Sequence, residues 1–408
     1  MILRLRAFQK ININVFFKDL IFIFLTLYLL PNDYKYYFKG LEILLNLSIL
    51  IFFTYVLIIK SSAIKFAFIN YWYIILIYMI SLISSINYNT FYAGAIKNLI
   101  SIMTISLMIG VYFYKDEKKY LKLIERISFI ILFINVILFV IFKEPLRYTD
   151  TGGRVYFIFE GSVYRLFFLN LISFLTINHF SIINRCLHIG IYIVTIYFIY
   201  VTSSTTTILI LMIFIFYLLL IRFKIFKEIL KRYKVLIICL FILTALVISG
   251  RFSSLLSVMF DKSMSLSGRT IIWEKSLSLF FKHPIFGIGV ISPSDLISFT
   301  GVKGATHTHN AYIGMLLSSG TFGFSLFCIL FYKLRNLKYV LSQKKYQYYL
   351  GYLFAMLIGS ITANYIDSLF YIYTFIILKD LKYNIHYYKT SNKHFMGKNR
   401  LKMNKVKQ

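Results

Sequence analysis

The sequence predicts an all-α, polytopic membrane protein with about twelve transmembrane helices and a large extracytoplasmic loop. Composition is the first reason: of 408 residues, 59% are hydrophobic and only 15% are charged, whereas soluble domains carry roughly 25% charged residues. The second reason is that long apolar runs separate the cations, and many approach the roughly 20 residues that a helix needs to cross a bilayer. These observations exclude a disordered chain, a collagen-like chain and a soluble enzyme.

About twelve apolar runs define the predicted spans, each ending where charged or turn-forming residues interrupt the run. We expect the seventh and eighth spans to form a hairpin that turns at residues 203–205. The predicted spans are residues 17–31, 41–59, 66–85, 96–114, 127–142, 162–181, 187–202, 206–221, 235–250, 311–332, 347–363 and 368–378.

The net charge of +30 is explained by the orientation of the chain in a membrane and does not indicate a nucleic-acid partner. A nucleic-acid-binding protein needs a continuous solvated basic face, and here the cations lie between apolar runs. With both termini in the cytoplasm, this arrangement places most Lys and Arg residues in cytoplasmic segments, as the positive-inside rule requires. We therefore expect no nucleic-acid partner, a single integral membrane domain at 1–378 and a basic cytoplasmic tail at 379–408.

Two predicted external loops are long, at roughly 143–161 and 251–310. Long loops in compact proteins are usually functional or disordered. The second loop is too apolar and too aromatic to be a free linker, so we expect a folded extracytoplasmic cap. All four prolines fall on the external side, at Pro31, Pro145, Pro284 and Pro293.

Within the second loop, the pattern from Arg269 to Lys282 predicts an amphipathic helix that ends before Pro284. Such a helix could lie in the bilayer interface or simply pack the loop down. Its predicted apolar face consists of Trp273, Leu277, Phe280 and Phe281.

Two histidines, His307 and His309, stand beside Asn310 directly before the tenth span. Alternate histidines on an extended strand share a face and could bind a metal ion, but no nearby Cys, Asp or Glu completes a ligand set. A histidine also titrates near neutrality, which suits a base or a proton donor. A third interpretation is that these are ordinary interfacial histidines. We favour the second and expect no metal.

The external arginines form a second group of candidates. A guanidinium group binds phosphate oxygens in a bidentate manner and stays charged at any working pH. For each arginine, the alternative is contact with lipid headgroups or an ion pair, for example with Asp150, Glu160 or Glu274. The five arginines are Arg147, Arg154, Arg165, Arg251 and Arg269.

The motif pieces in residues 268–323 resemble the shared region of bacterial O-antigen ligases and of O-antigen or capsule repeat-unit polymerases (Wzy-type). The most specific piece is His309-Asn310 followed by nine residues and Gly320-x-x-Gly323 on a membrane helix. The other pieces are Gly268-Arg269-x3-Trp273 and His283-Pro284-x-x-Gly287-x-Gly289.

This resemblance implies glycan transfer at the outer face of the bacterial cytoplasmic (inner) membrane, from undecaprenyl diphosphate and without a cofactor. It implies that Arg269 holds the diphosphate and that His309 activates the acceptor hydroxyl, with Asn310 beside it. Relatives also place functional arginines in the two long external loops, and many carry an arginine at the hairpin equivalent to 203–205, where this chain has none. The further candidates for substrate binding are therefore Arg154, Arg147, Arg165, Arg251, His307 and Trp273.

Several functions fit this pattern. We favour a polymerase of lipid-linked repeat units in O-antigen or capsular polysaccharide biosynthesis, with a chain-length regulator and a flippase of the same pathway as expected partners. A ligase that transfers the glycan to a lipid A core or another terminal acceptor remains the alternative within the family. A repeat-unit flippase is the non-enzyme alternative. It would need charged or polar groups distributed through the spans, whereas charge in or beside the spans is scarce and lies near helix ends, at Glu42, Lys97, Arg165 and Asp367.

Overall fold

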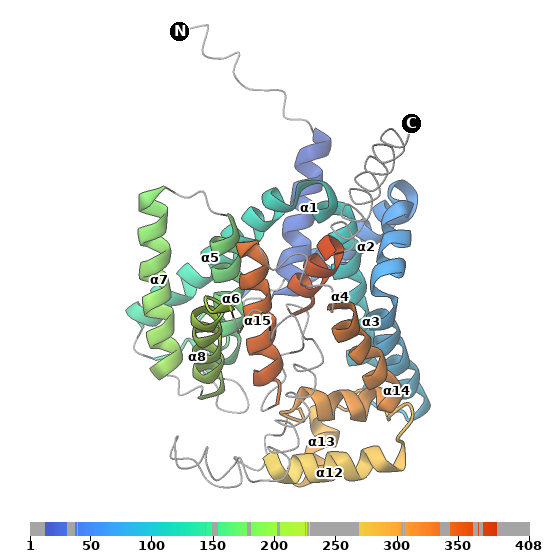
Figure 1. Ribbon diagram of the computed structural model, residues 1–408. Helices are drawn as coiled ribbons and strands as arrows, with labels where there is room; N and C mark the ends of the chain where they lie inside the picture. Colours follow the sequence, from blue (N-terminus) through green and yellow to red (C-terminus); the bar gives the residue numbers. More distant parts are fainter. Residues whose placement is uncertain are drawn as a thin grey trace, which may run out of the picture. The chain divides into compact units, whose positions relative to one another are not determined.

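The computed structural model describes most of the chain as two compact units, each of which is described here by itself (Figure 1). The first unit comprises residues 1–68 and 103–208, and the second comprises residues 69–102 and 209–408. Apart from a few isolated residues, the structure describes residues 13–30, 37–38, 40–142, 144–148, 154–177, 181–201, 205–224, 269–302, 307–334, 343–361 and 370–381.

Eleven of the predicted spans coincide with helices in the described residues, and the predicted span at 235–250 lies outside them. The structure therefore confirms a polytopic α-helical fold in broad terms. The helices are α1 (Ile13–Leu29), α2 (Leu41–Ile59), α3 (Ser61–Asn87), α4 (Tyr92–Met108), α5 (Tyr114–Ile141), α6 (Glu160–Ile177), α7 (Ile182–Val201), α8 (Thr205–Leu220), α14 (Ala311–Leu334), α15 (Lys344–Gly359) and residues 370–381.

Six helical segments among the described residues are long and apolar enough to cross a membrane. The apolar stretches of α6 and α8 are shorter than these. A total of twelve spans thus remains a prediction, whereas the membrane location does not depend on the total. The six segments are Leu41–Ile59, Ser61–Asn87, Ala93–Phe113, Asp116–Ile141, Ile182–Val201 and Ala311–Leu334.

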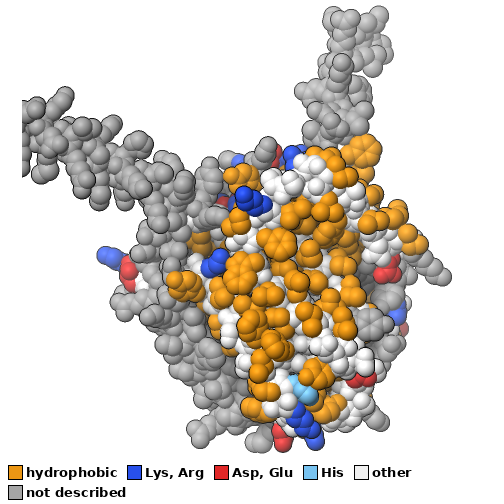
Figure 2. Space-filling view, turned by 90° about the vertical axis from the view of Figure 1, so that its right-hand side faces the viewer, with side chains coloured by type: hydrophobic (Ala, Val, Ile, Leu, Met, Phe, Trp, Pro, Cys, Tyr) orange, Lys and Arg blue, Asp and Glu red, His pale blue; other side chains and the backbone are white. Residues whose placement is uncertain are grey.

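Helix α2 shows why these helices require a lipid environment. Its side chains Ile43, Leu50 and Ile58 are exposed by 64%, 64% and 76%. Figure 2 shows one face of the protein on which hydrophobic side chains form a nearly continuous surface. In water a contiguous apolar patch of this kind would drive association, so we interpret it as a surface in contact with lipid.

The connection between α4 and α5 differs from the prediction. The chain passes from α4 through one π-helical turn, Ile109–Phe113, directly into α5. The segment 115–126, which the sequence placed between two spans, is therefore helical, with non-helical dihedral angles at Asp116 (φ −145°, ψ 50°). The break at Asp116 separates the apolar segment Ala93–Phe113 from the next one, Asp116–Ile141.

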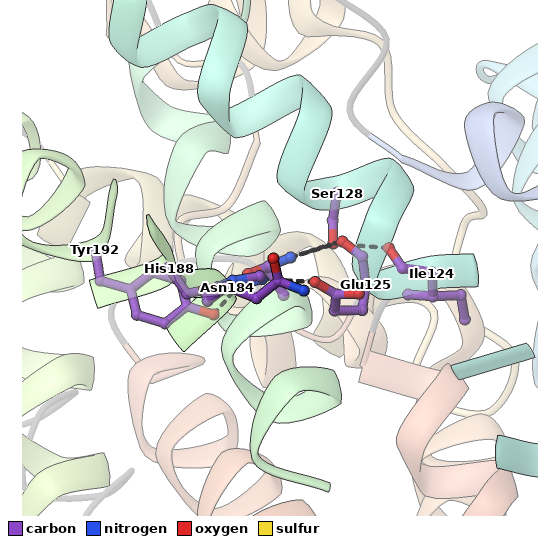
Figure 3. A network of polar contacts seen from close by, with 7 residues as sticks. Ile124, Glu125, Ser128, Asn184, His188 and Tyr192 are labelled. Atoms are coloured by element: carbon purple, nitrogen blue, oxygen red, sulfur yellow. Dashed lines mark hydrogen bonds and ion pairs between the residues drawn. The ribbon is translucent and has the colours of Figure 1, made fainter. Parts of the chain in front are cut away.

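In the first unit, a buried network of polar side chains joins α5 to α7 (Figure 3). Glu125 Oε1 lies 2.6 Å from His188 Nε2, and the two residues are only 2% and 4% exposed. The other ring nitrogen of His188 lies 2.8 Å from the carbonyl oxygen of Asn184. The sequence does not predict this pair, because Glu125 lies in the gap between the predicted spans 96–114 and 127–142.

Helix α6 joins the same network through Asn170, which is fully buried. The Asn170 amide donates to the carbonyl oxygen of Glu125 at 2.7 Å and to Ser128 Oγ at 3.1 Å. Tyr192 of α7 donates its hydroxyl to Asn170 Oδ1 at 2.6 Å. The network thus connects three helices by hydrogen bonds, which in an apolar setting fix their relative rotation.

Replacing Glu125 by Ala should destabilise the protein by roughly 2–5 kcal/mol, because the buried imidazole of His188 then loses its carboxylate partner. Unfolding of the purified variant in detergent measures this effect. The matched control is Lys122→Ala, which removes an exposed side chain of the same helix. Equal unfolding temperatures for Glu125→Ala and the control would contradict a stabilising network.

In the second unit, the segment after α12 (Arg269–Lys282) packs into a break in α14. Gly320 interrupts α14 with φ 66° and ψ −169°. On one side of the break, Ile288 N donates to the Leu317 carbonyl oxygen at 2.8 Å, and on the other, Thr321 N donates to the Pro284 carbonyl oxygen at 2.8 Å. The loop therefore supplies partners for backbone groups that the broken helix leaves unpaired.

The same loop also bonds to the turn between α3 and α4. Val290 N donates to Ser85 Oγ at 2.8 Å, and Phe91 N donates to the Val290 carbonyl oxygen at 2.8 Å. Thr90 Oγ1 donates to the Ile288 carbonyl oxygen at 3.0 Å. The segment 284–290 is thus anchored on two sides, as expected for a folded segment. A further short helix that the sequence did not predict, α13 (Pro293–Thr300), follows this anchor.

At the end of the described chain, residues 370–381 form a helix that extends three residues into the predicted tail. Asp380 accepts a hydrogen bond from the Tyr346 hydroxyl at 2.8 Å and pairs with Lys345 Nζ at 3.0 Å. The rest of the predicted tail lies outside the described residues.

Candidate functional site

The side chain of Asn310 caps the start of α14. Its Oδ1 accepts hydrogen bonds from the backbone N–H groups of Tyr312 and Ile313, both at 3.0 Å. Asn310 is fully buried, and its carbonyl oxygen accepts from Thr308 Oγ1 at 2.8 Å and from Gly314 N at 2.9 Å. A cap of this kind contributes about 1 kcal/mol to a helix. The sequence assigned Asn310 to substrate binding, whereas these contacts give its oxygen a structural role.

His309, directly before the cap, has an unusual backbone conformation. Its φ of 52° is left-handed, which among the described non-glycine residues is shared only by Asn89. Holding such a residue costs about 1–3 kcal/mol and is commonest at functional sites. The extended strand assumed in the metal hypothesis is therefore wrong at this residue. The described residues also contain no group of three His, Cys, Asp or Glu side chains that could hold a metal ion.

The rings of His307 and His309 lie beside each other, with centroids 4.0 Å apart. Helix α12 holds the residue between the two histidines, because Trp273 Nε1 donates to the Thr308 carbonyl oxygen at 2.8 Å. Trp273 is only 2% exposed. The sequence assigned this residue to substrate binding, and the structure shows that it holds the loop between the two histidines.

Arg269 lies one helical turn before Trp273, on the same side of α12. Burial, together with the nearby charges of His307 and Arg269, lowers the pKa of His309 from its usual 6.5 to about 3. His309 is therefore a neutral imidazole at physiological pH. It can accept a hydrogen bond or a proton, which a protonated histidine cannot do.

The bounds predicted for the amphipathic helix are confirmed, since α12 begins at Arg269 and ends at Lys282. Its buried face is rotated slightly from the prediction. Phe281 is 71% exposed and Leu277 is only partly buried, while Ser276 is fully buried. The helix packs against α13 and α14 (Figure 1). The buried residues of α12 are Ile272, Trp273, Ser276 and Phe280.

A cavity of about 480 Å³ is lined in part by His307, whose ring lies beside that of His309. Its wall includes His307 and Thr308, together with parts of α3, α4, the loop after Gly289 and the first turns of α14. All of these elements belong to the second unit, and most of the lining side chains are apolar. The second unit by itself therefore combines a neutral histidine, an arginine and a cavity large enough for part of a ligand.

The other predicted arginines lie in the first unit or outside the described residues. Arg147 is in strand β1 (Arg147–Tyr148) and Arg154 in strand β2 (Arg154–Val155), which pair in antiparallel register. Arg147 is opposite Val155 and Arg154 is opposite Tyr148. Because paired residues share a face and successive residues alternate, the two exposed arginines point to opposite faces of this hairpin.

Arg165 belongs to the first turns of α6. Its Nε donates to the hydroxyl of Tyr164 at 2.7 Å, and its guanidinium carbon lies 5.6 Å from the centroid of that ring. Arg251 lies outside the described residues. The structure thus groups Arg269, Trp273, His307, His309 and Asn310 in one unit, and it does not group the remaining arginines with them.

The apolar helices and the histidine site before α14 define an integral membrane protein with a cavity at one end of a broken helix. In a comparison with protein families, residues 190–328 match the model of a family described as O-antigen ligase. The matched region begins inside α7, ends inside α14 and contains the whole motif at 268–323. The resemblance to the O-antigen ligase and polymerase family is therefore confirmed. Comparison with curated proteins gives no match.

Proposed function

We propose that the protein polymerises oligosaccharide repeat units linked to undecaprenyl diphosphate, at the outer face of the cytoplasmic membrane. The observation that carries this proposal is the neutral His309 beside Arg269 and an open cavity, within the region that matches the O-antigen ligase family. In such a reaction the acceptor hydroxyl oxygen attacks the anomeric carbon of the donor glycan. The bond from that carbon to the diphosphate oxygen breaks, and undecaprenyl diphosphate leaves with the electron pair.

The residues of the site have complementary tasks in this reaction. The guanidinium of Arg269 compensates the negative charge that develops on the leaving diphosphate. A nitrogen of His309 takes the proton from the attacking hydroxyl. A base with a pKa of about 3 is weak in the empty protein. A bound diphosphate would offset the positive charge of Arg269 and raise that pKa, so that substrate binding strengthens the base.

A ligase is the second candidate, because the matching family is described as O-antigen ligase. Donor chemistry would be the same, and only the acceptor would differ. A lipid A core or another terminal acceptor would replace the second lipid-linked repeat unit.

Reconstitution of the purified protein with labelled lipid-linked repeat units separates these functions. A polymerase forms a ladder of longer glycans from the repeat units alone. A ligase forms a product only after a terminal acceptor is added. A flippase moves the label across the bilayer and forms no new glycosidic bond, a result that would overturn the proposal.

Replacing Arg269 by Ala should lower the rate of bond formation by about 10²–10³-fold, because one charge-compensating donor is lost from the leaving group. Arg269→Lys should recover only part of the rate, since lysine keeps the charge but not the bidentate geometry. Single-turnover assays with labelled repeat units measure both variants. Rates equal to the wild type in Arg269→Ala would remove Arg269 from the site.

A further inference from the structure

One face of α4 forms a wall of the cavity. The lining residues of this helix are Gly94, Lys97, Asn98 and Ile102, which are spaced at i, i+3, i+4 and i+8. Residues with this spacing share one side of a helix. Lys97 and Asn98 therefore lie on the side of α4 that faces the cavity.

Lys97 is the one charged residue in the sequence of α4, and it lies inside the apolar segment Ala93–Phe113. Lys97 is exposed and lies near the start of this segment, and it is the one charged side chain in the described cavity lining. The described residues provide no partner for the Lys97 ammonium group, which makes neither a hydrogen bond nor an ion pair with them. An anionic ligand would compensate this charge.

The rest of the described cavity lining agrees with an anion. It contains no Asp or Glu side chain, while Asn98 and His307 add polar groups. Apolar side chains such as Ile77, Leu296 and Met315 complete the wall. A positively charged group in an apolar wall fits an amphiphile with a phosphate head and a hydrocarbon chain better than it fits a free sugar.

We propose that this cavity binds the phosphate of a membrane lipid, with Lys97 as its counter-ion and Asn98 as a hydrogen-bond donor. In glycan transfer the lipid is the polyprenyl diphosphate carrier; this identification of the lipid rests on the proposed function. His307 lines the same cavity and contacts His309. The site would therefore hold the phosphate next to the histidine pair, with Lys97 as a second cation in addition to Arg269.

Binding of a polyprenyl diphosphate without a glycan tests this site. The full-length protein is placed in nanodiscs of phosphatidylcholine, and the lipid is titrated in. Lys97→Gln should weaken binding by about 10–100-fold, the loss expected for a hydrogen bond to a charged group. Lys97→Arg should retain most of the affinity. Lys65→Gln, which changes an exposed lysine of α3 outside the cavity lining, should bind like the wild type.

Equal affinities of wild type and Lys97→Gln, with equal unfolding temperatures, would overturn the proposal and leave Lys97 as an ordinary interfacial lysine. A competition series with phosphatidylglycerol identifies the source of the phosphate. No displacement supports the carrier lipid, whereas displacement at similar concentrations supports a phosphate site but overturns its assignment to the carrier. Because the probe has no glycan and no bond forms, the binding result is independent of whether the protein is a polymerase, a ligase or neither.

Discussion

Replacing His309 by Asn should lower the rate of glycan transfer by about 10²–10⁴-fold, the usual contribution of a positioned general base. Asparagine is the informative substitution because it tolerates the left-handed backbone that His309 adopts at φ 52° better than most residues do. His309→Asn therefore preserves the loop and removes the proton acceptor. His309→Ala combines the chemical loss with backbone strain, so it should be at least as inactive and also less stable.

The measurement is single-turnover bond formation with labelled lipid-linked repeat units, together with the unfolding temperature of each variant. A pH series of the wild type adds a second readout. Because the pKa of His309 in the free protein lies at about 3, kcat/KM should not decline through protonation of His309 as the pH falls from 7.5 to about 5.5. A histidine with the ordinary pKa would lose activity across that window. Full activity of His309→Asn would exclude His309 as the base.

The sequence predicted the helix at Arg269–Lys282 with both ends correct, because a helical apolar period and a following proline are local signals. The face it buries was predicted less well. Phe281, in the last turn of the helix, is exposed, and the small Ser276 packs inward instead. A hydrophobic period specifies that a helix has a buried side, but the shape of its neighbours decides which residues at the edge of that side become buried.

The role of Asn310 as a helix cap can be predicted from the sequence, whereas the pairing of Glu125 cannot. An Asn directly before an apolar helix is a local N-cap signal, and in the structure Asn310 caps the helix that begins at Ala311. Glu125 and His188 lie 63 residues apart in the sequence, on two different helices. Neither residue carries a local signal for the other, so only packing of α5 against α7 brings them together.

The glycines of the motif gain a physical explanation that the resemblance alone did not give. Glycine allows close approach because it has no Cβ. In the structure Gly287 lies against the break in α14, and Gly289 lies against Ser85 at the end of α3. Both have positive φ, 68° and 85°. Their role in the described structure is to join the segment after α12 to the helices around the cavity.

Replacing Gly287 by Ala should therefore prevent correct folding of the site, although Gly287 has no side chain that could take part in the reaction. A Cβ at this position would meet the carbonyl oxygen of Leu317 and would lie 2.8 Å from the backbone nitrogen atoms of Ser319 and Gly320. Backbone atoms of a packed helix cannot move aside as a flexible side chain can. The left-handed conformation adds about 1–2 kcal/mol for any residue with a Cβ.

The expected result is a loss of stability of about 3 kcal/mol or more, from overpacking and backbone strain combined. It should appear as low yield of folded protein in the membrane and a lower unfolding temperature in detergent. Gly190→Ala is the matched control, since Gly190 lies within α7 and a Cβ there meets no atom within 4 Å. Alanine favours a helix by about 1 kcal/mol relative to glycine, so this control should be neutral or stabilised. If Gly287→Ala folded as well as Gly190→Ala, the close approach of the loop to the broken helix would not be a requirement of the fold, and the glycines of the motif would need an explanation in ligand binding instead.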